Sequence, residues 1–499
     1  MKRILTAEQM KKCDSYTIET VGIPSRELMQ RAADAAFREI MSSGLDLTKV
    51  LCICGTGNNG GDGLAVAMLL HESGVKTEFF VCGDVSRMTE ECAYRYDVLK
   101  KEGVNEQTEL ELAGVTLVVD GLLGIGITGD VRDEAADVID LVAASGVPVA
   151  ALDIPSGVNA DTGGIMGRAL TAQLTIAFAR LKAGHLLYPG RKNCGRTMVA
   201  DIGIGEDGIS DDALIMELAE IQDIKKLIPH RDPHSHKGTY GRVLTVAGSE
   251  GMCGAAYFSA LASYRSGAGL VEVFTPKANL PIIQTRLPEA IVTGWADNAA
   301  VILSERLKAA DSCVIGPGLG KGSNAAELVK VALVSDLPLV ADADALNLIA
   351  ECDELKGKLR MRTAPTVITP HAAEMSRLCG VSISDVLHDP VKISTDFSKE
   401  YGVVCVMKNS ATVVAMNDRV FINNTGSSAL AKGGSGDVLT GIIGAFLAAG
   451  KDALTSATAG VYIHGLSGEL AAEELSEYSV LATDTADHIG KAIKKIMQK

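Results

Sequence analysis

Thr425-Gly-Ser-Ser-Ala-Leu-Ala-Lys-Gly-Gly-Ser-Gly-Asp-Val-Leu-Thr-Gly-Ile-Ile-Gly-Ala-Phe-Leu-Ala-Ala-Gly450 is the stretch that decides the fold of the second half of the chain. Its four small residues, 433–436, permit a sharp turn in which backbone N–H groups can approach a ligand. An apolar helix is expected to follow at once. Because a helix N-terminus has unpaired N–H groups and a partial positive charge, the stretch predicts a site for a phosphate or an oxyanion.

Asp437 lies just inside this predicted anion site. Carboxylates are favoured at helix starts, so one interpretation is that Asp437 only caps the helix with its charge. The other interpretation is an acid or base that acts on a phosphate. The small-residue turn, the preceding Gly426-Ser-Ser and the terminal Gly450 favour this second interpretation.

The length and composition indicate two α/β domains. A chain of 499 residues is too long for one ordinary core. Its 47% hydrophobic residues, 52 glycines and only 4% aromatics fit glycine-turned units of strands and helices. The net charge of −15, without a cluster of Lys and Arg, argues against a nucleic-acid surface.

Cysteine usage and hydropathy predict a soluble cytoplasmic protein. The eleven cysteines are scattered and form no Cys-x-x-Cys pair, so we expect reduced and mostly buried thiols. The N-terminus becomes polar after two apolar residues, which is not a signal peptide. No run approaches the roughly 18–20 apolar residues that a membrane span needs, so we expect no membrane partner.

The chain begins with two predicted helices. Thr6 and Gln9 fit a capping box, and Pro24 is expected to open the second helix. We expect these helices to cover a sheet edge or a partner subunit, and the protein to be a homo-oligomer. A strand at 49–54 then leads through a loop at 55–63 into a helix at 64–73.

That loop has the dinucleotide-binding spacing Gly55-x-Gly57-x-x-Gly60 between a strand and a helix, and Asp84 follows a second strand. The spacing alone is a weak signal. The run Asn58-Asn-Gly-Gly-Asp-Gly63 is more specific, because an ordinary phosphate loop does not need two amides and a carboxylate together. The alternative is a glycine turn with left-handed asparagines.

Two further predicted strands, 116–120 and 148–153, end in aspartates. In an open parallel sheet the carboxyl ends of the strands line the ligand crevice, so polar side chains there can converge. The converging set is Asn59, Asp62, Asp120, Asp153 and Ser156. Each aspartate could cap a turn, whereas several on one rim favour a cation site or acid–base chemistry. After strand 174–178, Arg180, Lys182 and His185 could contact phosphates or be solvated.

The second half predicts another mostly parallel α/β/α sheet, with a domain boundary near residue 220 and a helical piece around 213–227 after the acidic stretch 206–212. The strands are expected at 242–247, 271–274, 290–293, 313–315, 339–341, 367–369 and 403–408, with a hairpin of 412–415 and 420–422. The segments that follow the strands carry Gly316-Pro-Gly-Leu-Gly320, Asp342-x-Asp344 and Thr369-Pro-His-Ala-Ala-Glu374.

Gly57-Asn-Asn-Gly-Gly-Asp-Gly63, together with Leu152-Asp-Ile-Pro-Ser-Gly-Val-Asn-Ala-Asp-Thr-Gly163, resembles the N-terminal domain of the YjeF family, the NAD(P)HX epimerases. The resemblance covers about 1–210 and implies a Rossmann-like three-layer α/β/α sandwich at 1–215. It implies that Asp153 lies at the reacting centre. The implied hydrate-binding residues are Asn58, Asn59, Gly60, Gly61, Asp62, Gly124, Ile125, Gly126, Ile127, Thr128, Gly129 and Asp130, and the implied potassium ligands are Asn59, Asp120 and Ser156.

His236-Lys-Gly-Thr-Tyr-Gly-Arg-Val243, Gly316-Pro-Gly-Leu-Gly320, Asp342-Ala-Asp-Ala-Leu-Asn347 and Gly433-Gly-Ser-Gly-Asp-Val-Leu439 resemble the ribokinase-like NAD(P)HX dehydratases. This resemblance implies a ribokinase-like α/β/α sandwich at 222–499. It implies hydrate contacts from Gly254, Gly320, His371 and the catalytic base Asp437. The implied adenine nucleotide site is Lys408, Asn409, Ser410, Ala411, Thr412, Ser427, Gly433, Gly434, Ser435 and Gly436.

The order of the two resemblances is that of the bifunctional NAD(P)H-hydrate repair enzymes, which implies the substrates NADHX and NADPHX and the co-substrate ADP or ATP. Magnesium is left open, since Asp342, Asp344 and Glu374 could be ligands or turn caps. Ala372-Ala373 and Asn409 depart from the Pro-Gly and Gly that the family usually has, and Ser435 replaces the more common Thr. The first departure is expected to loosen the turn that places Glu374.

Three alternatives remain open from the sequence. The anion site and Asp437 would also serve a kinase of a small alcohol. The glycine spacing at 55–60 would also serve a dehydrogenase, although the two asparagines argue against it. The first domain could instead be a binding or scaffold module without catalysis.

Overall fold

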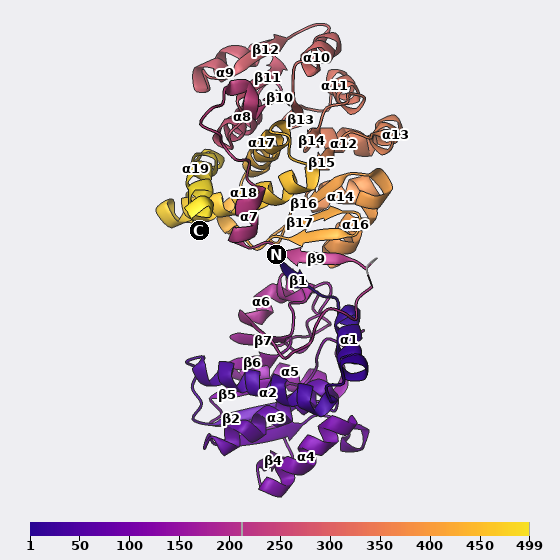
Figure 1. The fold of residues 1–499 in the computed structure, drawn as a ribbon, viewed down its shortest axis with the longest axis vertical. Coiled ribbons are helices and arrows are strands. Elements are labelled where there is room, and N and C mark those ends of the chain that lie inside the picture. The colour runs from indigo at the N-terminus through magenta and orange to yellow at the C-terminus, as the bar shows by residue number, and fades with distance from the viewer. Residues whose placement is uncertain (211–212, 499) are drawn as a thin grey trace. The chain divides into compact units, whose positions relative to one another are not determined.

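The computed structural model describes residues 1–210 and 213–498, so Asp211 and Asp212 of the acidic stretch lie outside the described residues. The chain divides into two compact units (Figure 1). The first unit is Arg3–Ala213, and the second comprises Met1–Lys2 and the residues from Leu214 onward. Each unit has its own sheet.

The first unit contains a seven-stranded parallel sheet of order β4-β3-β2-β5-β6-β7-β8. The chain fills one side of β2 with β3 and β4, and then returns to place β5 on the other side. Ligands bind at such a switch point, at the carboxyl ends of the strands. The strands are β2 (Val50–Cys54), β3 (Thr77–Val81), β4 (Asn105–Gln107), β5 (Leu117–Gly121), β6 (Val149–Leu152), β7 (Leu174–Phe178) and β8 (Arg196–Ala200).

Both faces of this sheet are covered by helices. Side chains of β2 alternate, so Val50, Cys52 and Cys54 join one core cluster while Leu51 and Ile53 join another. The first cluster lies under α1 (Ala7–Tyr16), α2 (Ser25–Ser42), α3 (Asn58–Glu72) and α4 (Glu90–Glu102), and the second lies under α5 (Asp133–Ser145). The expected three-layer Rossmann-like sandwich is therefore confirmed. A short helix, α6 (Gly190–Cys194), precedes β8.

The sheet of the second unit has eleven strands in the order β1-β9-β18-β17-β16-β15-β14-β13-β10-β11-β12. All neighbouring strands from β16 to β12 in this order, including β10 and β11, are parallel. Strands β17 and β18 form the expected antiparallel hairpin. The strands are β1 (Lys2–Ile4), β9 (Ile215–Leu218), β10 (Arg242–Val246), β11 (Leu270–Pro276), β12 (Ile291–Trp295), β13 (Ser312–Ile315), β14 (Leu339–Ala341), β15 (Thr366–Ile368), β16 (Val404–Met407), β17 (Val413–Met416) and β18 (Arg419–Ile422).

The apolar stretch that follows Gly434 forms α17 (Ser435–Ala448), which is buried along most of its length against α8 and the sheet. It places the turn 433–436 near the ends of β14 and β16. The other helices are α7 (Ile221–Leu227), α8 (Cys253–Arg265), α9 (Leu280–Arg286), α10 (Ala299–Leu307), α11 (Ser323–Leu333), α12 (Asp344–Glu351), α13 (Asp353–Met361), α14 (Ala372–Cys379), α15 (Ile383–His388), α16 (Pro390–Tyr401), α18 (Ala453–Leu475) and α19 (Ala482–Gln498).

Two expectations about local structure were wrong. The segment 58–63 is the first part of α3 and not a loop. Because Gly60 has no side chain, the first turn of the helix can pack against the backbone of Gly55. The piece around 213–227 is not wholly helical: β9 precedes α7, because Ile215–Leu218 pairs with β18 and so extends the sheet. The second unit accordingly begins upstream of residue 222.

Candidate active sites

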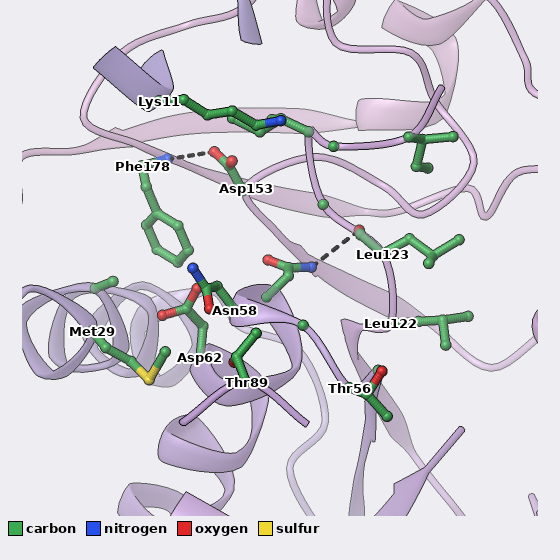
Figure 2. A pocket seen from close by; sticks show the side chains of 18 of the residues that line it. Lys11, Met29, Thr56, Asn58, Asp62, Thr89, Leu122, Leu123, Asp153 and Phe178 are labelled. Atoms are coloured by element: carbon green, nitrogen blue, oxygen red, sulfur yellow. Dashed lines mark hydrogen bonds between the residues drawn. The ribbon is translucent and has the colours of Figure 1, made fainter. Parts of the chain in front are cut away.

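A cavity of about 870 Å³ opens at the switch point of the first sheet (Figure 2). Residues that follow β2, β3, β5, β6 and β7 line it, as Rossmann-like topology requires. Two predicted helices also contribute, through Asp14 of α1 and Met29 of α2 among others. These helices therefore cover the ligand crevice itself.

Asp153 follows β6 and is fixed in the cavity wall. Its carboxylate forms an ion pair with Lys182, whose side chain is fully buried, and Oδ1 accepts a hydrogen bond of 3.0 Å from the N–H of Phe178 (Figure 2). The backbone of Asp153 is left-handed, with φ of 60°. Such a conformation is strained for a residue with a side chain and persists only where neighbours impose it.

His185 is one of those neighbours. Its Nδ1 accepts a hydrogen bond from the N–H of Lys182 at 2.9 Å, so Nε2 carries the proton and donates it to the Asp153 carbonyl at 2.7 Å. Burial, with the charge of Lys182, lowers the pKa of His185 to about 4. His185 is thus a neutral brace at physiological pH. Lys182 and His185 are buried and therefore not solvated, and Lys182 lines the cavity, while Arg180 pairs with Glu206 at 2.8 Å.

Asp62 projects into the same cavity from the first turns of α3. Burial raises the pKa of Asp62 well above its ordinary value, and the charges of Asp153 and Asp14 raise it further. This shift favours the protonated form of Asp62. The cavity thus holds two carboxyl groups in different surroundings, one buried beside other acids and one paired with a lysine.

Asn59, Asp120 and Ser156 meet around the segment that follows β5. Asp120 accepts hydrogen bonds from the hydroxyl of Ser156 at 2.5 Å and from its N–H at 2.8 Å, while Asn59 donates to the carbonyl of Leu123 at 3.1 Å. Burial raises the pKa of Asp120 to about 6, although those hydrogen bonds lower it. A buried carboxylate among hydroxyl and carbonyl oxygens is a donor set that fits a hard cation such as potassium.

The remaining implied residues of the first unit divide into two groups. Asn58, Gly124, Ile125, Gly126 and Ile127 line the cavity, whereas Gly60, Gly61, Thr128, Gly129 and Asp130 are not part of its wall. Gly60 and Gly61 matter for packing, since an added Cβ would lie 1.8 Å from the Gly55 carbonyl and 2.6 Å from Met29. Asp84, which the dehydrogenase alternative needs, instead accepts a 2.9 Å hydrogen bond from the N–H of Ser86.

In the second unit, Lys408 and Asp342 bring the ends of β16 and β14 together. Their ion pair measures 2.7 Å, and Lys408 lies 3.9 Å from Glu374. Burial alone would lower the pKa of Lys408, but the two carboxylates raise it above its ordinary value. Lys408 is therefore a charged lysine with its head held beside the glycine turn, where an added Cβ on Gly436 would lie 3.3 Å from Nζ.

Asp437 lies in the first turn of α17. Burial raises the pKa of Asp437 to about 7, and the charge of Asp342 raises it further while Lys408 opposes the shift. A group with that pKa is suited to accept a proton near neutral pH. The preceding Gly434 is left-handed and faces Phe258, whose ring would lie 2.8 Å from an added Cβ, so only glycine fits there.

His371, Glu374 and Asp344 of this site are fixed by hydrogen bonds within the protein. His371 caps α14: its Nδ1 accepts from the N–H of Ala373 at 3.1 Å, and its own N–H donates to Glu374 at 2.8 Å. The turn with Ala372-Ala373 is thus closed by a capping box, and the expected loosening does not occur. Asp344 accepts from the N–H of Gly320 at 2.8 Å.

The same hydrogen bonds and ion pairs involve the carboxylates that could be magnesium ligands. Asp342, Asp344 and Glu374 are each engaged by a lysine or a backbone N–H. Across residues 1–210 and 213–498, no three His, Cys, Asp or Glu side chains are grouped so as to hold a metal ion. We derive no step through magnesium.

The other residues implied for the second unit make contacts within their own segments. Ser427 accepts from the N–H of Ala429 at 3.3 Å, Asn409 accepts from the N–H of Ser410 at 2.8 Å, and Thr412 donates to the carbonyl of Asn409 at 3.3 Å. Gly254 stands near the ring of Phe258. Ala411 is buried, and Gly433 has open space where a Cβ would be.

The fold and the two sites define an α/β protein with a Rossmann-like unit and a unit built around the buried helix α17. Residues 25–184 match the family model described as YjeF-related protein N-terminus, and residues 243–493 match the model described as NAD(P)H-hydrate dehydratase. The chain belongs to the family of bifunctional NAD(P)H-hydrate repair enzymes.

Its similarity to curated members of that family extends over nearly the whole chain. It is 35% identical to the bifunctional NAD(P)H-hydrate repair enzyme of Coxiella burnetii, covering 96% of this chain and 97% of that one. It is 33% identical to the enzyme of the same name from Escherichia coli, covering 96% and 91%. A ribokinase-like superfamily protein from Enterococcus faecalis, 30% identical, covers 57% of this chain and 97% of its own with a TM-score of 0.51.

Proposed function

We propose that this chain repairs hydrated NADH and NADPH, with its first unit interconverting the R and S hydrates and its second unit dehydrating the S form with ADP or ATP. The observation that supports this assignment best is that one chain of this family has two separate sites. One site is a cavity at a dinucleotide-type switch point, and the other is an anion-binding helix start with an acid whose pKa is about 7.

In the second unit we assign proton removal to Asp437. It would take the proton of the ring hydroxyl as that oxygen attacks the terminal phosphate of the nucleotide and the shortened nucleotide leaves. Loss of the phosphate from the ring, with loss of a proton from the neighbouring ring carbon, would then restore the dihydronicotinamide. The N–H groups of 434–437 would stabilise the transferring charge, a contribution of about 10²- to 10³-fold per donor. Lys408, kept charged by Asp342, would hold a phosphate oxygen.

In the first unit the hydrate would occupy the cavity, with Asn58 and Asp62 on one side of it and Asp153 on the other. Asn59, Asp120 and Ser156 would hold potassium, which supplies positive charge beside a buried carboxylate and the substrate's pyrophosphate. Gly254, Gly320 and His371 would contact the hydrate in the second unit, while 409–412 and Ser427 would contact the nucleotide. The full chain would act on small molecules in the cytoplasm as a homo-oligomer.

The test is to supply a mixture of R and S hydrates to the full chain with ADP or with ATP, and to follow recovered NADH absorbance with and without potassium. Complete recovery is expected, and Asp153→Ala should leave the R hydrate unconsumed. A stable phosphate ester in place of NADH would favour a small-alcohol kinase. Binding of the hydrate by the first unit without any interconversion would favour a scaffold module.

No helix among the described residues is both long and apolar enough to cross a lipid bilayer.

A further inference from the structure

The two carboxyl groups of the first-unit cavity suggest a division of labour that the substrate-binding role of Asp62 does not include. We propose that Asp62 is the general acid and Asp153 the general base of epimerisation, acting on opposite faces of the hydrated ring. This inference rests on the proposed epimerase function and deepens it. It makes Asp62 a catalytic residue and Lys182 a positioning residue.

The placement of the two groups is the first support. Asp62 comes from α3, on the segment that follows β2, and Asp153 comes from the end of β6, so they belong to different walls of one cavity. Figure 2 shows them apart, with Asn58 between them in that view. Inversion at one carbon needs a group on each side of the ring, because the bond that breaks and the bond that forms lie on opposite faces.

Their environments are the second support. Asp153 is paired with a buried lysine, is bonded to the N–H of Phe178, and has its backbone braced by neutral His185, so it is a rigid carboxylate. Asp62 faces two other acids, Asp153 and Asp14, with Arg95 as an opposing charge. Two carboxyl groups in one cavity, one beside other acids and one compensated by a lysine, form the pattern that separates the acid role from the base role in acid–base catalysis.

The chemistry balances without an added reactant. Asp62 gives its proton to the ring hydroxyl, the C–O bond breaks as the lone pair of the ring nitrogen forms a C=N bond, and water leaves. Water then adds to the opposite face, its proton passes to Asp153, and the C=N electron pair returns to nitrogen. One proton has moved from Asp62 to Asp153, and it returns through solvent or when the opposite epimer reacts.

The experiment measures interconversion of purified R hydrate by the full chain in H₂¹⁸O without nucleotide, with mass spectrometry of the hydrate. Wild type should incorporate one ¹⁸O per inversion, because the hydroxyl leaves and solvent water replaces it. Inversion without ¹⁸O would show that the ring opens at the C–N bond and would overturn the proposal. This readout does not depend on any variant being folded.

The variants then assign the residues. Asp62→Asn and Asp153→Asn should each slow interconversion by about 10²- to 10⁴-fold. Asp97→Asn, which changes an exposed acid of α4 outside the cavity wall, is the matched control and should keep the wild-type rate. Thermal melting of each variant verifies folding.

Asp14→Asn tests the rival acid in the cavity. A large loss there with none in Asp62→Asn would place the acid on α1 and overturn the proposal, whereas a loss confined to Asp62→Asn and Asp153→Asn supports it. Failure of wild type to interconvert the epimers at all would instead overturn the proposed epimerase function, so the two failures are distinguishable.

Discussion

The two units place a lysine and an aspartate at strand ends in different ways. In the first unit the buried Lys182 pairs directly with Asp153, the residue expected at the reacting centre. In the second unit Lys408 pairs with Asp342 instead, and Asp437 is left beside acids with its pKa raised to about 7. The same residue types thus give a fixed carboxylate in one site and a proton acceptor poised near neutrality in the other.

The largest expected effect comes from removing the carboxylate of Asp437. Asp437→Asn should lower the rate of S hydrate dehydration by about 10²- to 10⁴-fold, because the amide cannot accept the hydroxyl proton. Epimer interconversion should be unchanged. The rate is measured as NADH recovered from S hydrate with ADP, and Asp487→Asn, an exposed acid of α19, is the control. Near-normal turnover would reduce Asp437 to a helix cap.

The role of Lys182 is tested by measuring the free energy of unfolding. Lys182→Met should destabilise the protein by about 3–5 kcal/mol, because it leaves Asp153 without its cation in a buried site. The double variant Lys182→Met with Asp153→Asn should recover most of that loss while remaining inactive as an epimerase. Urea unfolding measures both. Equal stability of the single and double variants would show that the ion pair does not hold the site.

The pH dependence of dehydration tests the raised pKa of Asp437. Because Asp437 must be ionised to accept a proton, kcat/KM should fall about tenfold per pH unit below pH 7 and level off above it. Asp344→Asn should move the midpoint to lower pH, since Asp344 is one of the charges that raise the pKa of Asp437. An unmoved midpoint would mean that another group titrates.

The smallest expected effect is a change in thermal stability of Asp437→Asn. The folded-state pKa of Asp437 is raised above its unfolded value, so the folded state binds the proton more tightly and loses stability as pH rises towards 7. The variant should therefore melt a few degrees above wild type at pH 8. The difference should vanish at pH 4, and melting curves at the two pH values test it.

Much of the fold could be predicted because its signals are local. Buried apolar runs mark the strands, and the capping box of Thr6 and Gln9 forms as predicted. The strand Ile215–Leu218 could not be predicted, because it exists only through its pairing with β18, far along the chain. The start of α3 at Asn58 was missed because glycines usually indicate a loop, and only the contact with Gly55 shows why they continue as helix.

The candidate site of the first unit could be predicted to a similar extent. Strand-end topology brings Asp62 and Asp153 to one cavity and places Asp120 on the strand between β2 and β6, as a parallel sheet requires. The burial of Lys182 was not visible, because a lysine between two basic neighbours in the sequence suggests a solvated face. The brace of His185 on the Asp153 carbonyl depends on backbone geometry that no spacing encodes. The only indication in the sequence was that Asp153 and His185 each lie at or after the end of a predicted strand.

The packing of Gly60 and Gly61 has a consequence for protein engineering. Neither position can take a side chain without moving Gly55 or Met29, so the start of α3, which carries Asn58 and Asp62, cannot be altered through these two glycines. The cavity wall contributed by α1 and α2 is different, because the exposed Lys11 and the half-buried Ser25 lie on helices that tolerate many side chains. A library meant to change which damaged cofactor is accepted should vary that wall and leave the glycines intact.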